Sequence, residues 1–526
     1  MFDLLLVSCL LSICAIFCLS VILVPTLAPD KPGLIGTASL IIAMLVGGSR
    51  LAPQADLMGA IFVVVTLALV PSVVIARSFR RIDMIAILFH RDFGMQGATL
   101  SGLKNEIATA VITALLLILS VLAHDAFLDA PSIFMVSAIM IVFLANPFVR
   151  YALSRLWQQP VKSVLLDRFQ QPTIVASSAR PDLVVVYLEG VDRRFHDEKV
   201  FGDITARLRR YEAEGISFSR VGQIAGTGWS LAGMVATQSG LPVAPRGLNF
   251  QKRLEDVEVF MPNQKFLADV LQEKGYESHY VVGGDTEFGG IGPMYRTHQI
   301  CQMTGIDAMK ASFPADDVSA ATAGWFVDDQ MVLDAAREIH KSLLKKEQPY
   351  ALIVETIGPH GPRGTISRKW TKSGKTENCD IPTSVSCLLD EVEEFLHDVR
   401  KAQASRGELR IVLLSDHLNH SPHLPKAGVE FEGYNTVIFW GAHDRRGEVV
   451  DKAGSMVDVF PTLLEWLGWS SGPVAAGIGR SLLSHPPTLV EEFGIPVVDR
   501  MITSDAAFAN RIWSTPPRLA EVQATA

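Results

Sequence analysis

The chain has 526 residues, of which 49% are hydrophobic and 19% are charged, and its mean hydropathy is +0.27. This composition is too apolar for a soluble enzyme alone and too charged for a bundle of membrane helices alone, so we expect a membrane part joined to a soluble part. Basic and acidic residues balance within residues 1–150, so the whole net charge of −8 falls on the rest of the chain, where no basic stripe indicates nucleic acid.

Apolar runs predict a transmembrane domain over residues 1–152. A membrane-spanning helix needs about 20 apolar residues, and four of the runs meet this length while the second is short, which leaves the number of spans open. The loop 77–106 holds five basic side chains, which favours the cytoplasm for it, whereas five spans with an inner N-terminus put it outside; charge alone does not settle the orientation. The runs are 4–27, 34–48, 57–76, 107–123 and 132–149.

The remaining chain predicts one large α/β domain. We expect a juxtamembrane linker at 153–180, the α/β domain itself at 181–504 and a C-terminal tail at 505–526, of which the last residues, 518–526, should be frayed. Short apolar runs alternate with helical patterns near 263–274, 326–345, 383–404 and 456–467, which is typical of a sandwich with a mostly parallel central sheet. The expected strands lie in "DLVVVYLEG", "GYESHYVVGG", "PYALIVETIG", "LRIVLLSDH" and "YNTVIFWG".

Two cysteines of this domain, Cys379 and Cys387, lie close in sequence. If the domain is extracytoplasmic, they are able to form a disulfide, but sequence alone leaves this pairing open.

Polar side chains with metal-binding chemistry follow the expected strands. Glu189 ends the first run, Asp416 and His417 end the fourth, and His360 lies beyond the third. Ligands bind beyond the carboxyl ends of strands in open α/β sheets, and Glu, Asp and His suit Zn²⁺ or Mn²⁺. Thr227 precedes a helical pattern, where a hydroxyl at a helix N-terminus is suited to attack a phosphoryl group and form a phosphothreonine.

Each of these residues also has an ordinary structural interpretation. A threonine before a helix is usually an N-cap, and a carboxylate after a strand is often a simple loop residue. His420 and His423, in "HLNHSPH", are either further ligands or solvated loop histidines, and we favour the second interpretation. Only the order and spacing of all the signals together favour a reactive site.

Several segments together resemble a known family. They are "VVVYLEG", "IAGTGWSLAGMVATQSGLP", "GWFVDDQMVLDAA", "LLSDHLNH", "SMVDVFPTLLEWLG" and "GIGRSLLS", within about residues 183–490. They are similar to the membrane-anchored phosphoglycerol transferases of periplasmic (osmoregulated) glucans, which group with lipoteichoic acid synthases in the sulfatase/alkaline phosphatase-like superfamily. The second segment resembles the nucleophile segment of those transferases.

This resemblance implies roles for individual residues. It implies one divalent metal ion, Mn²⁺ with Zn²⁺ or Mg²⁺ as alternatives, held by Glu189, Thr227, Asp416 and His417. It also implies that Thr227 is the nucleophile, that His360 contacts the substrate phosphate, and that Trp325 lines the substrate pocket.

The resemblance implies a function as well. The enzyme would sit in the bacterial inner membrane as a multi-pass protein, with its catalytic domain facing the periplasm, and would transfer phosphoglycerol from phosphatidylglycerol in the membrane lipid to a periplasmic glucan. The alternatives are transfer of phosphoethanolamine or of a glycerophosphate polymer to another acceptor, and hydrolysis by a phosphodiesterase or sulfatase. A sulfatase needs Cys or Ser at the nucleophile position, where this chain has Thr227.

Overall fold

The computed structural model describes residues 163–514, except short gaps at 177–178, 245–253, 255–256, 422, 425–432, 442–444 and 471–473, and parts of 62–70, 108–118 and 139–149 before them. Of the described residues, those before residue 160 form one compact unit and those after it form another.

The described N-terminal residues form short helical stretches at 62–67, 108–118 and 139–144. None of the helices in the described part of the chain is both long and apolar enough to cross a membrane. The expected spans 4–27 and 34–48 lie outside the described residues, and 57–76, 107–123 and 132–149 lie only partly inside them. The transmembrane domain therefore stays a prediction.

The second unit is built on an eight-stranded sheet with the order β13-β2-β12-β11-β1-β8-β4-β5. Five neighbouring strands, from β11 to β5, are parallel, whereas β12 is antiparallel to β11 and to β2. The strands are β1 (Asp182–Leu188), β2 (Ile216–Phe218), β4 (Glu277–Val282), β5 (Gln302–Thr304), β8 (Tyr350–Glu355), β11 (Leu409–Ser415), β12 (Val437–Trp440) and β13 (Glu448–Val450). The prediction of an α/β domain with a mostly parallel central sheet is confirmed.

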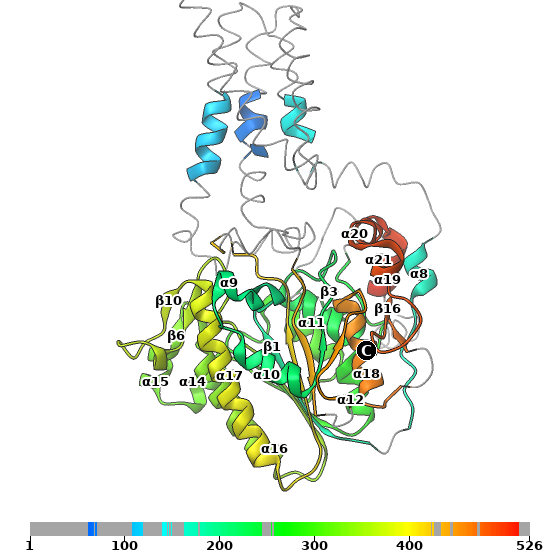
Figure 1. Cartoon of the computed structure of the whole chain (residues 1–526). Helices are drawn as coiled ribbons and strands as arrows, with labels where there is room; N and C mark the ends of the chain where they lie inside the picture. The colour runs from blue at the N-terminus through cyan, green and yellow to red at the C-terminus, as the bar shows by residue number, and fades with distance from the viewer. Residues whose placement is uncertain are drawn as a thin grey trace, which may run out of the picture. The chain divides into compact units, whose positions relative to one another are not determined.

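Helices cover both faces of this sheet, as Figure 1 shows with α16 and α17 on one side and α11, α12 and α18 on the other. All residues of β1 are buried, because valine-rich strands with apolar side chains on both faces need a layer on each side. One core lies among α8 (Val164–Arg168), α11 (Ser230–Ser239), α12 (Leu267–Glu273), α13 (Ile291–Thr297), α18 (Val459–Trp466), α19 (Leu489–Phe493), α20 (Ile495–Ser504) and α21 (Ala506–Trp513). The other lies among η2 (Arg193–His196), α10 (Ala206–Glu214), α14 (Ile306–Ser312), α15 (Ala315–Ala321), α16 (Asp329–Leu343) and α17 (Ile381–Gln403), with α9 (Glu198–Phe201) beside it.

Small two-stranded sheets and single-turn helices shape the loops around this core. The pairs are β3 (Val221–Gly222) with β14 (Gly454–Ser455), β6 (Thr322–Ala323) with β7 (Phe326–Val327), β9 (Gly364–Ile366) with β10 (Glu377–Cys379), and β15 (Ala475–Ala476) with β16 (Gly479–Arg480). The single turns are η4 (Phe288–Gly290), η5 (Arg368–Trp370) and η8 (Met456–Asp458).

The structure corrects two expectations at the edges of this domain and answers one question that the sequence left open. Residues 506–513 of the expected tail form α21, whose Phe508 and Ile512 are wholly buried, so the domain extends beyond residue 504. The expected linker contains α8, whose Leu165 is buried in the same core. Cys379 and Cys387 are free thiols, so the disulfide that sequence left open is not formed.

Candidate active site

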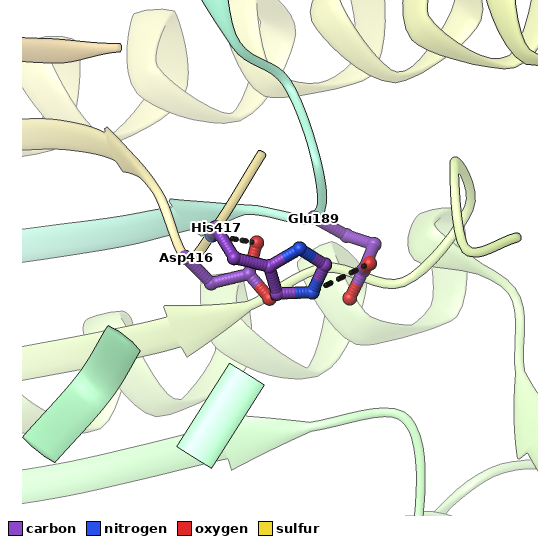
Figure 2. Close-up of side chains that lie close together, drawn as sticks. All are labelled: Glu189, Asp416 and His417. Atoms are coloured by element: carbon purple, nitrogen blue, oxygen red, sulfur yellow. Dashed lines mark hydrogen bonds and ion pairs between the residues drawn. The ribbon is translucent and has the colours of Figure 1, made fainter. Parts of the chain in front are cut away.

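Three of the expected site residues meet at the carboxyl ends of two adjacent strands. Glu189 follows β1, and Asp416 and His417 follow β11, and the parallel pairing of Leu188 with Ser415 places the two strand ends side by side. One ligand atom of each residue lies within 4.8 Å of those of the other two. Figure 2 shows the three side chains gathered at these strand ends. The Nε2 atom of His417 is 3.4 Å from Glu189 Oε1 and 3.3 Å from Asp416 Oδ2.

The cluster has the chemistry of a cation site. Asp416 Oδ1 accepts hydrogen bonds from the amides of Gly190 (2.9 Å) and His417 (2.8 Å), whereas its Oδ2 is buried without a hydrogen-bond partner among the described residues. The Nδ1 atom of His417 donates to the carbonyl of Leu418 at 2.8 Å, so in the neutral ring the lone pair of Nε2 faces the carboxylates. Two carboxylates and one imidazole suit a borderline divalent metal ion, so the residues present fit such an ion.

The pKa shifts in the cluster come from burial and from the charges that its three residues exert on one another. Burial raises the pKa of Asp416, and the negative charge of Glu189 raises it further. Burial alone would lower the pKa of His417, but the charges of Asp416 and Glu189 outweigh it and raise this pKa to about 10. Burial would also raise the pKa of Glu189, but the charge of His417 holds it below its usual range. The two acids therefore attract positive charge strongly.

The segment that carries Thr227 packs against this cluster through α11. The N-cap of α11 is Trp229, and Thr227 Oγ1 instead donates to the carbonyl of Ile224 (2.8 Å) and accepts from its amide (3.2 Å). The interpretation of Thr227 as a simple helix cap is therefore wrong. Thr227 itself is wholly buried, and its roles as nucleophile and metal ligand stay predictions.

Two contacts hold the first turns of α11 on the cluster. Ser230 Oγ donates to Glu189 Oε2 at 3.4 Å. A Cβ atom at Gly233 would lie 1.7 Å from the carbonyl oxygen of Asp416, so glycine is required for this close approach. The positive end of the helix dipole thus lies at the carboxylates, where it favours an anion.

His360 and Trp325 lie together beside the site. Their rings are edge to face with centroids 6.0 Å apart, and Phe288 stacks on Trp325 at 4.8 Å. The loop that carries His360 is tied to the segment after His417, because the carbonyl of Pro359 accepts from Asn419 Nδ2 at 3.3 Å. The Nδ1 atom of His360 donates to the carbonyl of Gly361 at 2.9 Å, so its Nε2 is the atom left for a substrate.

Sequence reasoning missed two residues here. Asp329 accepts hydrogen bonds from the amides of Ile357 (2.7 Å) and Gly358 (2.8 Å) and so holds the start of the loop that carries His360. His420 stacks on His417 with centroids 5.0 Å apart, so its interpretation as a solvated histidine is wrong, whereas His423 is exposed as expected. The adjacent acids "DD" at a helix start were a signal for Asp329, but one that a helix cap explains equally well.

The comparisons with known proteins identify the family. Residues 181–469, more than half of the chain, match the family model described as Sulfatase. The chain belongs to the sulfatase family. A protein in the alkaline phosphatase superfamily from Vibrio parahaemolyticus has the same fold, with a TM-score of 0.50 and 18% identity, covering 70% of this chain and 96% of that chain.

Curated relatives of this sulfatase-family chain carry the name Phosphoglycerol transferase I. The relative from Xanthomonas axonopodis pv. citri (strain 306) is 28% identical over 427 residues, which are 77% of this chain and 58% of the relative. The relative from Escherichia coli O6:K15:H31 (strain 536 / UPEC) is 30% identical over 323 residues, which are 60% of this chain and 41% of the relative. The match thus spans less than two thirds of the length of either relative. The resemblance inferred from the sequence segments is confirmed at the level of the family.

Proposed function

We propose that this protein transfers phosphoglycerol from phosphatidylglycerol to a periplasmic glucan, through a covalent phosphothreonine at Thr227 beside a single divalent metal ion. The observation that carries the proposal is the buried cluster of Glu189, Asp416 and His417 with the start of α11 packed on it. The relatives named Phosphoglycerol transferase I support the group transferred.

The residues divide the reaction into two displacements. In the first, Thr227 Oγ attacks the phosphorus of the lipid, the bond from phosphorus to the diacylglycerol oxygen breaks, and diacylglycerol leaves with a proton. In the second, a glucan hydroxyl attacks the same phosphorus, loses its proton, and releases Thr227. When bound, a divalent cation such as Mn²⁺, Zn²⁺ or Mg²⁺ screens phosphoryl charge and lowers the pKa of a hydroxyl.

The remaining residues have roles that follow from their positions. For His360, we propose that Nε2 contacts the phosphoryl oxygens, because its Nδ1 is engaged by the carbonyl of Gly361. For Trp325, beside that imidazole, we propose contact with the transferred group.

The location of the enzyme is part of the proposal: a multi-pass protein of the bacterial inner membrane with its catalytic domain in the periplasm. The described helical stretches of the N-terminal region support this, because large apolar side chains on them are 40–65% exposed. They are Val64, Leu67, Val111, Ile112, Leu115, Leu116, Met140, Phe143 and Leu144. Apolar side chains in such numbers are stable on an outer surface when lipid is the solvent.

One alternative has an observation in its favour. The matched family model is described as Sulfatase, so water is a candidate acceptor in place of a glucan. A threonine is not a precursor of formylglycine, which weighs against sulfate esters and leaves phosphodiester hydrolysis as the competing reaction.

The test is an acceptor assay on the purified full-length protein. Phosphatidylglycerol labelled in its headgroup is supplied with Mn²⁺, with and without periplasmic glucan, while diacylglycerol and glucan mass are followed. We expect diacylglycerol release that depends on glucan and a gain of phosphoglycerol mass on the glucan. Release of diacylglycerol with free phosphoglycerol and unlabelled glucan would assign the protein to the hydrolases.

A pair of variants tests the nucleophile in the same assay. Thr227→Ala should reduce transfer to background, while Thr322→Ala, at an exposed threonine in β6, should leave it unchanged. Without acceptor, mass spectrometry of the wild-type protein should find the phosphoglyceryl group on the peptide that holds Thr227. An adduct on another residue would refute the assignment.

A further inference from the structure

Three consecutive residues of one loop donate side-chain hydrogen bonds to backbone carbonyls of two other loops. Asn419 Nδ2 donates to Pro359 O (3.3 Å), and Ser421 Oγ donates to Pro362 O (2.7 Å). Between them, His420 Nε2 donates to Gly228 O at 2.9 Å. The first two acceptors lie in residues 357–362, here called the histidine loop because it carries His360. The third lies in residues 224–229, here called the nucleophile loop because it carries Thr227.

The donating segment, residues 419–421, is itself fixed by the loop that follows β1. The amide of Asn419 donates to Asp192 Oδ2 at 2.9 Å, and Arg194 Nη2 donates to the carbonyl of Asn419 at 2.7 Å. Asn419 Oδ1 in turn accepts from the amide of Ser421 at 2.9 Å. Asn419 and Ser421 are both buried. Residues 419–421 are therefore a rigid support, and the histidine loop and the nucleophile loop are both attached to it.

His420 makes a second contact, which links residues 419–421 to the cluster of Glu189, Asp416 and His417. A carbonyl oxygen only accepts, so the hydrogen bond to Gly228 requires the proton on Nε2. In this orientation the ring lies almost parallel to that of His417, at an angle of 12° and a centroid distance of 5.0 Å. One side chain thus touches both a residue of the ligand cluster and the backbone carbonyl next to Thr227.

We propose that residues 419–421 form a clamp that sets the distance between Thr227 and His360, with Asn419, His420 and Ser421 as positioning residues. The inference rests on the proposed function, in which both side chains act on one phosphorus atom. Two groups on separate loops need a common support for this, because a displacement of about 1 Å at a reacting centre costs on the order of 100-fold in rate.

The competing explanation is that these are ordinary loop hydrogen bonds. Each would then contribute about 1 kcal/mol to stability, and its loss would lower the folded fraction without changing the rate of the molecules that remain folded. The two explanations differ in what happens to kcat when it is calculated per folded molecule.

Conservative variants separate the donor from the rest of each side chain. His420→Gln keeps an N–H group near the position of imidazole Nε2, whereas His420→Ala removes it. Asn419→Asp keeps the Oδ1 acceptor for Ser421 but removes the donor to Pro359. His423→Ala, at the exposed histidine of the same loop, is the matched control.

The experiment uses full-length protein with Mn²⁺ and bis(p-nitrophenyl) phosphate, a phosphodiester that reports on displacement without lipid or glucan. We expect His420→Ala to lower kcat for p-nitrophenolate release by about 10- to 100-fold, with KM changed less than about threefold. We expect His420→Gln to recover most of the loss and His423→Ala to behave as wild type. A loss of rate that matches the loss of folded protein, or no rescue by glutamine, would overturn the clamp.

A double-mutant cycle tests the link to His360 itself. If His420 acts by setting the distance to His360, His420→Ala should cost much less in a His360→Ala background, since the second group is already absent. Equal fractional losses in the two backgrounds would show that the two residues are independent and would refute the inference.

The outcome for the clamp is separable from that for the proposed function. A wild-type protein that cleaves the phosphodiester but labels no glucan would refute glucan transfer and leave the clamp to the variants. If the wild-type protein cleaved no phosphodiester, amide hydrogen exchange would decide: His420→Ala should speed exchange in residues 224–229, and Asn419→Asp in 357–362. Unchanged exchange in both loops would overturn the clamp.

Discussion

A buried acid lies at each end of strand β1, and the two acids differ in the hydrogen-bond donors and positive charges around them. At the amino end, Asp182 is surrounded by donors: Oδ1 accepts from the amide of Tyr350 (2.9 Å), and Oδ2 accepts from Gln403 Nε2 (2.6 Å) and Arg406 Nε (2.8 Å). The protein itself thus supplies the positive charge and the hydrogen bonds that a buried carboxylate requires.

At the carboxyl end, Glu189 faces a second acid instead. Among the described residues, Asp416 Oδ2 is buried without a hydrogen-bond partner, and His417 is the basic group of the cluster. Two carboxylates with one imidazole are incomplete in charge, whereas Asp182 with Arg406 is complete. A buried acid that the protein fully satisfies serves the fold, and one that it leaves short of positive charge is suited to binding a cation.

The largest expected effect on activity comes from removing a negative charge at the carboxyl end of β1. Asp416→Asn keeps the oxygen that accepts from the amides of Gly190 and His417 but removes a negative charge beside Glu189. We expect transfer to fall at least about 1,000-fold, by loss of electrostatic stabilisation, while the metal-free protein unfolds at the same or a higher temperature. A metal-free variant much less stable than metal-free wild type would show that Asp416 serves the fold instead.

The complementary change at the amino end of β1, where Asp182 has its charge partner, should lower stability and leave activity intact. In Asp182→Asn, the new amide N–H₂ group faces the donors of Gln403 and Arg406, and a buried charge loses its partner. We expect a loss of about 3 kcal/mol in the free energy of unfolding, measured by urea denaturation. The transfer rate per folded molecule should equal that of wild type, and a slower rate would remove the contrast between the two ends.

Metal binding should distinguish the two variants once more. A ligand that binds only the folded state stabilises it by about 2.7 kcal/mol at 100 times its Kd. We expect Mn²⁺ to raise the unfolding temperature of wild type and of Asp182→Asn alike, and chelation to reverse the rise. Asp416→Asn should show little or no shift, and a full shift in this variant would exclude Asp416 from the ligands.

The sequence was sufficient for the parts of the site that depend on strand order alone. Glu189 and Asp416 follow long apolar runs, and parallel strands bring their ends to one edge. It was insufficient where partners are remote: the acceptor of His420 lies 192 residues away, and no local pattern reveals it. The same limit applies to α21, whose short apolar pattern gains its helix from packing on a core formed by distant segments.

A third buried acid tests whether a buried carboxylate elsewhere in this protein also needs a positive charge to stay ionised. Glu391 of α17 accepts from Ser367 Oγ (3.0 Å) and Trp370 Nε1 (2.8 Å), but no basic group is among these donors. Burial raises its pKa to about 8, and the charge of Asp329 adds to the shift. The charge of Lys369 lowers this pKa but does not offset the burial. A carboxyl with hydrogen bonds but no salt bridge among the described residues should therefore be neutral in the folded protein near neutral pH.

Glu391→Gln is therefore expected to matter only through pH. Between pH 6 and 7 the folded protein holds a proton on Glu391 that the unfolded chain has lost, so unfolding releases a proton and wild-type stability falls as pH rises. Glutamine has no such proton. From pH 6 to pH 7, the free energy of unfolding of the variant should therefore rise by about 1 kcal/mol relative to that of wild type, measured by urea denaturation at both pH values. A difference that stays constant would mean that Glu391 is ionised in the fold, stabilised by its hydrogen bonds and the charge of Lys369 without a salt bridge.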